Sequence, residues 1–83
     1  MLKPHDFNSN ENKIQVIASF NKNQDIKPLY FKYNDKTITI LSCTCEKSHS
    51  IYSFKCRVES EGYTKFVNIR YYIKLCLWTL IAN

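Results

Sequence analysis

Glycine is almost absent from this sequence: Gly62 is the single glycine among 83 residues, and there are only two prolines. With one glycine, the chain has no glycine-rich loop of the kind that cradles phosphates in nucleotide-binding enzymes. It also has no run of about 18 apolar residues, the length that a membrane-spanning helix needs. Residues Met1–Asp6 lack the apolar segment of a secretory signal. We therefore expect a cytoplasmic protein that does not bind membranes.

The sequence also lacks the paired groups that catalysis requires. Its two histidines, His5 and His49, lie in a predicted tail and a predicted loop, where nothing orients either against a cysteine or serine. The seven carboxylates lie in polar turn or surface contexts, and no two of them form a pair suited to acid–base work. We therefore predict that the protein is not an enzyme and has no cofactor.

What the chain does contain is a repeated alternation of apolar and polar residues. In Ser50–Ser60, Tyr52, Phe54, Cys56 and Val58 are apolar, whereas the residues between them are polar or charged. Side chains of a β-strand alternate between two faces, so this pattern indicates a strand with one buried face. The same reasoning predicts strands at 13–20, 26–33, 37–44, 51–59 and 63–71, and a sixth at 72–81 after a helical turn around 69–74.

Short polar turns separate these segments, which predicts an all-β fold with five or six antiparallel strands in meander order. Gly62 is the expected positive-φ residue of one turn, and asparagine substitutes for glycine in the others, as at Asn34-Asp35. An SH3-like barrel is the leading architecture because closure removes exposed edges. An open sheet completed by dimerisation is the alternative. Residues 1–12, rich in asparagine and without periodicity, predict a flexible tail before a single β-barrel domain at 13–83.

The segments Val16–Phe20 and Ile26–Phe31 resemble a family of small proteins from Firmicutes, especially clostridia, whose function is unknown. That family reads V-I-A-x-F-D, a short glycine-containing turn, and then I-x-P-L-Y. Tyr52–Val58 loosely matches a later strand of the family, and Phe66–Arg70 and Trp78 match its end. The chain departs from the family in its asparagine turns and in Cys43–Cys45. The resemblance implies a compact bacterial, cytoplasmic β domain and brings no functional residue with it.

The four cysteines are expected to be reduced thiols in a cytoplasmic protein. Cys43 and Cys45 share one strand face, with His49 four residues on, and these three residues are the zinc candidates. Structural zinc sites generally use Cys-x2–4-Cys turns, however, and the chain has no second pair. Cys56 falls in register with the apolar positions of its strand. We therefore predict small buried hydrophobic residues, with zinc or a Cys43–Cys45 redox pair as the alternatives.

The net charge of +5 and a pI near 9.1 favour acidic partners or nucleic acid. Ten of the twelve cations are lysine and they are scattered, which is also typical of an ordinary solvated surface. On the predicted solvent-exposed strand faces, cations lie among aromatic residues, as in small β-barrels that bind single-stranded nucleic acid. These candidates are Lys32, Lys55, Arg57, Lys65 and Arg70. Having only two arginines argues against a dedicated nucleic-acid reader.

Six tyrosines and one tryptophan are more amphipathic aromatics than a small core needs. Such residues are enriched at protein interfaces, and Tyr30, Tyr72 and Trp78 are the candidates here. We predict a small interaction module that binds a protein partner, or forms a homodimer, through exposed aromatics and a free edge strand. Single-stranded nucleic-acid binding is the alternative, and dispersal of the cations over all faces would count against it.

Overall fold

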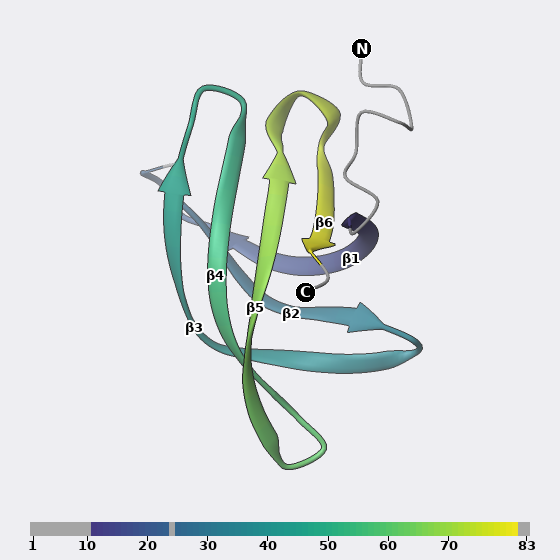
Figure 1. Cartoon of the computed structure of the whole chain (residues 1–83). Coiled ribbons are helices and arrows are strands. Elements are labelled where there is room, and N and C mark those ends of the chain that lie inside the picture. Colours follow the sequence, from purple (N-terminus) through teal and green to yellow (C-terminus); the bar gives the residue numbers. More distant parts are fainter. Residues whose placement is uncertain (1–10, 24, 82–83) are drawn as a thin grey trace.

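A computed structural model describes residues 11–23 and 25–81, which form six antiparallel strands and one short 3-10 helix (Figure 1). In chain order the elements are β1 Glu11–Phe20, β2 Ile26–Tyr33, β3 Lys36–Lys47, β4 Ile51–Ser60, β5 Tyr63–Tyr72, η2 Ile73–Leu75 and β6 Leu77–Ile81. Each strand pairs with the next, and β6 pairs with β1, so the sheet closes into a small barrel. The predicted all-β meander and barrel are confirmed, and the open-sheet alternative is wrong.

The first strand begins two residues before the predicted boundary at Lys13. Glu11 and Asn12 pair with Ile81 and Leu80 of β6, so the ladder that closes the barrel includes them. These two residues belong to the sheet rather than to the predicted tail; residues 1–10 lie outside the described part of the chain.

Other boundaries differ from the prediction as well, most of them by one residue. Strand β3 continues to Lys47 because residues 45–47 still pair with β4. The helical turn predicted around 69–74 lies at Ile73–Leu75, and β6 begins only at Leu77.

Two hairpins use turns in which both central residues have positive φ. The values are 51° at Asn34 and 62° at Asp35 in one, and 54° at Glu61 and 81° at Gly62 in the other. This is the type I′ geometry, whose twist matches that of the flanking strands. The predictions for Gly62 and for asparagine in place of glycine at Asn34 are confirmed.

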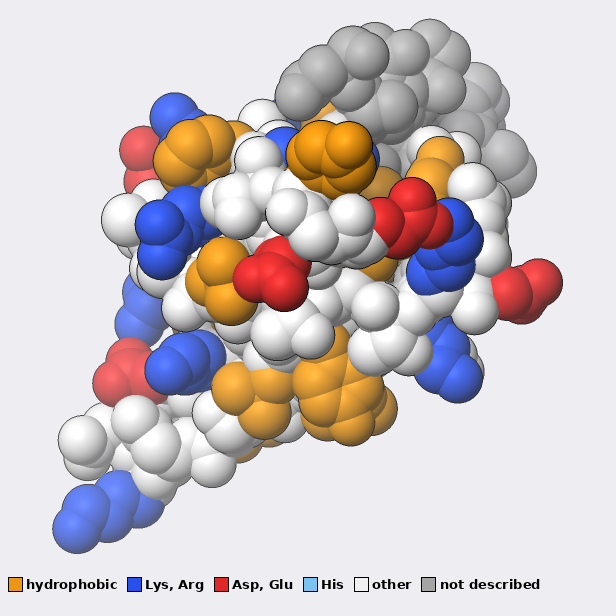
Figure 2. All heavy atoms as spheres, turned by 90° about the horizontal axis from the view of Figure 1, so that it is seen from below, with side chains coloured by type: hydrophobic (Ala, Val, Ile, Leu, Met, Phe, Trp, Pro, Cys, Tyr) orange, Lys and Arg blue, Asp and Glu red, His pale blue; other side chains and the backbone are white. Residues whose placement is uncertain are grey.

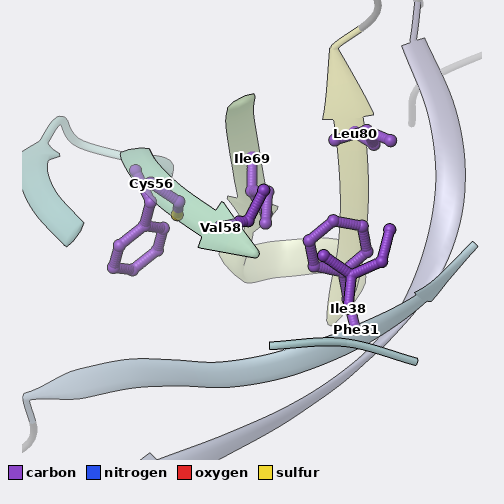
Figure 3. Packing of buried hydrophobic residues seen from close by; sticks show 7 residues of the cluster. Phe31, Ile38, Cys56, Val58, Ile69 and Leu80 are labelled. Atoms are coloured by element: carbon purple, nitrogen blue, oxygen red, sulfur yellow. The ribbon is translucent and has the colours of Figure 1, made fainter. Parts of the chain in front are cut away.

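The core is formed by side chains from β2 to β6 that point into the space between the strands (Figure 3). Its buried members are Phe31, Ile38, Phe54, Cys56, Val58, Ile69 and Leu80. The indole of Trp78 packs at the edge of this core, with ring centroids 5.6 Å from Phe54 and 4.7 Å from Tyr71. The predicted burial of Cys56 is confirmed.

A β-bulge in each of two adjacent strands changes which residues face the core. Leu29 has no partner between the pairs Ile17–Tyr30 and Ala18–Pro28, and Leu41 is skipped in the same way in β3. A bulge shifts the alternation of side chains by one residue. Pro28 and Phe31 are consequently both buried, whereas Leu29 is exposed. Strands β2 and β3 pair only between their hairpin turn and the two bulges, from Tyr33–Lys36 to Tyr30–Thr39.

Candidate functional site

Strand β6, as far as the structure describes it, leaves one side of the first half of β5 uncovered. Strand β4 pairs with β5 along its whole length, but β6 pairs only with Asn68–Tyr72. Within the described residues, Tyr63–Val67 therefore has a strand neighbour on one side only. Figure 1 shows the corresponding end of the β4–β5 hairpin extending below the rest of the barrel.

Backbone groups of Thr64 and Phe66 point toward this uncovered side. The two-residue turn at Glu61-Gly62 makes Ser60 and Tyr63 a hydrogen-bonded pair, and ladder bonds then alternate along the hairpin. Thr64 and Phe66 consequently occupy non-hydrogen-bonded pairs with β4, and their N–H and C=O groups face away from it. Together they offer two donors and two acceptors to an added strand. We call Tyr63–Val67 the open edge.

An apolar hollow of about 270 Å³ adjoins the open edge. It is lined by Phe31 and Tyr33 of β2, Ile38 of β3, Lys65, Phe66 and Val67 of β5, and Leu80 and Ile81 of β6. Lys65 is the one charged residue in this lining. The side chains at its rim are accessible, with exposed fractions of 61% for Phe66 and 38% for Tyr33. The hollow thus combines room for apolar side chains with a neighbouring set of backbone hydrogen-bonding groups.

Cations and an aromatic ring lie together on the outer face of β4 and β5. The Lys55 ammonium lies 5.7 Å from the centroid of the Phe66 ring, within range of a cation–π contact. Arg57 of β4 lies directly opposite Phe66 of β5, so the two side chains project from the same face of the sheet. A second hollow of about 370 Å³ adjoins this face, lined in part by Lys55 and Arg70.

The structure does not bring the five predicted nucleic-acid residues onto one surface. Lys55, Arg57 and Arg70 share the outer face of β4 and β5, whereas Lys65 lines the apolar hollow and Lys32 lies on β2 beside Gln15. Figure 2 shows the face seen from below, on which Lys and Arg side chains lie in several places, more of them toward the left of the view. Among the five, the pair Lys55 and Arg57 is the one that flanks an exposed aromatic ring.

Arg70 is paired with a buried carboxylate, while 41% of its own side chain stays exposed. The Glu11 side chain is 2% exposed, and its Oε1 accepts a hydrogen bond from Arg70 Nη1 at 2.6 Å. Glu11 Oε2 accepts bonds from Tyr72 Oη at 2.6 Å and from Thr79 Oγ1 at 3.1 Å. The contact with Tyr72 and the nearby Glu11 raise the pKa of Arg70. Burial, followed by its bond to Glu11, raises the pKa of Tyr72.

Sequence reasoning missed this network because it assigned Glu11 to the tail. No pattern marks a carboxylate at the first position of a strand as buried; its partners come from β5 and β6, far along the chain. The network also explains why Tyr72, a predicted interface residue, is only 9% exposed.

The other two predicted interface aromatics differ from each other in exposure. Trp78 is half-buried against the core, whereas Tyr30 is 39% exposed and lies opposite the exposed Ile17 on the outer face of β1 and β2. Sequence reasoning did not single out Phe66, although alternation places it on the same strand face as the polar residues Asn68 and Arg70. The exposed rings near the open edge are Tyr33, Tyr63 and Phe66.

The cysteines are free thiols: Cys43 is half-buried, Cys56 is buried, and Cys45 and Cys76 are exposed. His49 lies exposed in the turn after β3. Among residues 11–23 and 25–81, no group of three or more His, Cys, Asp or Glu side chains is placed to hold a metal ion. The zinc candidates Cys43, Cys45 and His49 therefore do not form a metal site in the described structure.

In comparisons with known proteins, the chain matches no family model, no curated protein and no solved structure. The resemblance noted in its sequence motifs therefore stays a prediction. The described residues include no helix of the length and apolar character needed to cross a membrane.

Proposed function

We propose that this protein is an interaction module that binds an extended segment of a partner protein along the open edge of β5. The observation that carries the proposal is the position of the backbone groups of Thr64 and Phe66, which have no strand partner among the described residues, beside an apolar hollow. In β-strand addition, the backbone of the incoming segment bonds to such an edge and alternate side chains enter an adjoining pocket. We expect this binding to take place in the cytoplasm.

Charge favours a partner segment that combines apolar and acidic residues. The chain carries a net charge of +5. Lys65 lines the hollow, and Lys55 and Arg57 lie on the adjoining outer face. Acidic side chains flanking the apolar positions of a partner segment would be attracted to these cations. A second copy of the chain brings the same positive charge, so repulsion opposes a homodimer through this edge.

A selection of linear peptides from a random display library tests the proposal without a known partner. We expect the selected peptides to alternate apolar residues with polar ones, including Asp or Glu, and to shift the backbone amide resonances of Thr64 and Phe66. Replacing Thr64 by proline removes one edge N–H that does not bond to β4, so it should weaken binding at least tenfold. Thr64→Ala is the matched control, because it keeps that N–H, and it should bind normally.

Three results would contradict the proposal. One is a selection that enriches no peptide, and another is a set of amide shifts that lies away from the open edge. The third is equal binding by the proline and alanine variants when circular dichroism shows both to be folded. Light scattering over a concentration series reports separately on a homodimer.

A second candidate function is single-stranded nucleic-acid binding on the outer face of β4 and β5. It is favoured by the contact of Lys55 with the exposed Phe66 ring and by Arg57 beside that ring. Binding of a fluorescent single-stranded oligonucleotide should then fall steeply between about 50 and 200 mM salt. Lys55→Ala with Arg57→Ala should abolish it, whereas Thr64→Pro should leave it unchanged. This opposite dependence on the variants separates the two functions.

A further inference from the structure

Two of the four cysteines lie directly opposite each other in neighbouring strands. Cys43 of β3 is paired with Cys56 of β4, and both side chains point toward the core from the inner face of the sheet. Hydrogen-bonded and non-hydrogen-bonded pairs alternate along the β4–β5 hairpin from the Glu61-Gly62 turn. By this alternation Cys56 forms a hydrogen-bonded pair with Val67 of β5, so its backbone groups point away from β3. The Cys43–Cys56 pair is therefore a non-hydrogen-bonded one, in which the Cα atoms lie about 4.5 Å apart and the side chains approach most closely.

This separation falls in the range of about 4.4–6.8 Å between Cα atoms that a disulfide spans without moving the backbone. Cys43 is close enough to contribute, after burial, to the raised pKa of the Cys56 thiol. The other cysteines lack such a partner in the described structure. Cys45 lies opposite Phe54, and Cys76 follows η2, where its thiol donates to the carbonyl oxygen of Ile73 at 3.8 Å.

We propose that Cys43 and Cys56 form a reversible cross-strand disulfide by exchange with a small-molecule disulfide such as oxidised glutathione. Cys43 is the attacking residue because it is half-buried, whereas Cys56 is fully buried. Its thiolate attacks one sulfur of the glutathione disulfide, forms a mixed disulfide and releases the first glutathione as a thiolate.

In the second step, the Cys56 thiolate attacks the Cys43 sulfur of the mixed disulfide and releases the second glutathione. The two protein thiols lose two electrons in total, the glutathione disulfide gains them, and the two protein protons pass to the released thiolates. The new bond joins β3 to β4 just after the bulge at Leu41. Burial is the main cause that raises the pKa of Cys56 to about 12, so this second step should accelerate as the pH rises above neutrality.

Incubation of the full chain with oxidised glutathione, followed by intact-mass spectrometry, tests the proposal. We expect a product that has lost two hydrogen atoms and that dithiothreitol returns to the starting mass. Cys43 and Cys45 lie in one tryptic peptide, because no lysine or arginine separates them. Variants must therefore assign the bond: Cys45→Ser and Cys76→Ser should still form it, and Cys43→Ser should not.

Other products would overturn the proposal. These are an unchanged mass, a glutathione adduct that persists at pH 9, a bond that survives in Cys43→Ser, or a bond that is lost in Cys45→Ser. Because Cys43 is only half-buried, its serine variant is expected to fold, and circular dichroism verifies this. None of these results depends on whether the open edge of β5 binds a peptide.

Discussion

Glu11 Oε1 lies 2.6 Å from Arg70 Nη1, so an ion pair joins the first strand of the barrel to the fifth, across β6. The carboxylate is almost fully buried and also accepts hydrogen bonds from Tyr72 and Thr79. A buried charge is stable only when it is paired and hydrogen-bonded. The network thus adds a side-chain connection to the β1–β6 ladder that closes the barrel.

Removing this carboxylate should weaken the fold. Glu11→Ala leaves Arg70, Tyr72 and Thr79 without their shared acceptor, and we expect a loss of about 3 kcal/mol in the free energy of unfolding. Urea denaturation followed by tryptophan fluorescence measures it. Glu46→Ala, which removes an exposed carboxylate, is the control and should change the free energy by less than about 0.5 kcal/mol. Equal effects of the two substitutions would show that the network contributes nothing.

The positive φ of Gly62 predicts a penalty that comes from the backbone alone. A Cβ atom built at Gly62 meets nothing within 4 Å, while its φ is 81°. Gly62→Ala should therefore destabilise the protein by about 1 kcal/mol through the left-handed conformation rather than through a clash. Gly62→Asn should cost less, because asparagine tolerates this region better. Thermal unfolding of the two variants would contradict this account if alanine were tolerated as well as asparagine.

Stability should fall at high pH because of Cys56. Burial raises the pKa of this thiol from 9.0 to about 12. Between these values the folded state holds a proton that the unfolded state has lost, so the free energy of unfolding decreases as the pH rises. We expect a contribution of about 1.4 kcal/mol per pH unit in that window. Urea denaturation at several pH values measures the slope, and Cys56→Ala should lack this contribution; identical slopes would contradict the prediction.

Two phenylalanines should respond in opposite ways to substitution by alanine. Phe54 is 1% exposed in the core, so Phe54→Ala should destabilise the fold by about 3 kcal/mol or more. Phe66 is 61% exposed, so Phe66→Ala should leave stability within about 0.5 kcal/mol while weakening binding at the open edge. Denaturation and peptide binding, measured on the same preparations, check both expectations. A large loss of stability in Phe66→Ala would remove it as a binding probe.

Local patterns were sufficient to predict the strands and most of the turns. The alternation in Ile51–Ser60 holds in the structure, because β4 has a strand neighbour on both sides and its residues 54, 56 and 58 face the core throughout. The turns followed from Asn34, Asp35 and Gly62, which tolerate positive φ, whereas the positive φ of Glu61 was not predicted. These features depend on neighbouring residues along the chain.

The candidate site was much less predictable. Strict alternation along Ile26–Tyr33 would place Leu29 and Phe31 on one face. The bulge at Leu29 separates them, because an unpaired residue reverses the facing of the residues that precede it. Alternation along β5 places Phe66 on the same face as Asn68 and Arg70. It does not reveal that this face is left open beside Lys55, on which the exposure of Phe66 depends.

The sequence by itself determined an all-β meander of short strands, with Cys56 in its core and Gly62 in a turn. Only the tertiary structure decided that Glu11 is buried against Arg70, that Cys43 faces Cys56, and that β6 covers half of β5. The physical reason is the range of the interactions. Strand alternation and turn conformation are set by neighbours along the chain, whereas these three features depend on the registers in which distant strands pair.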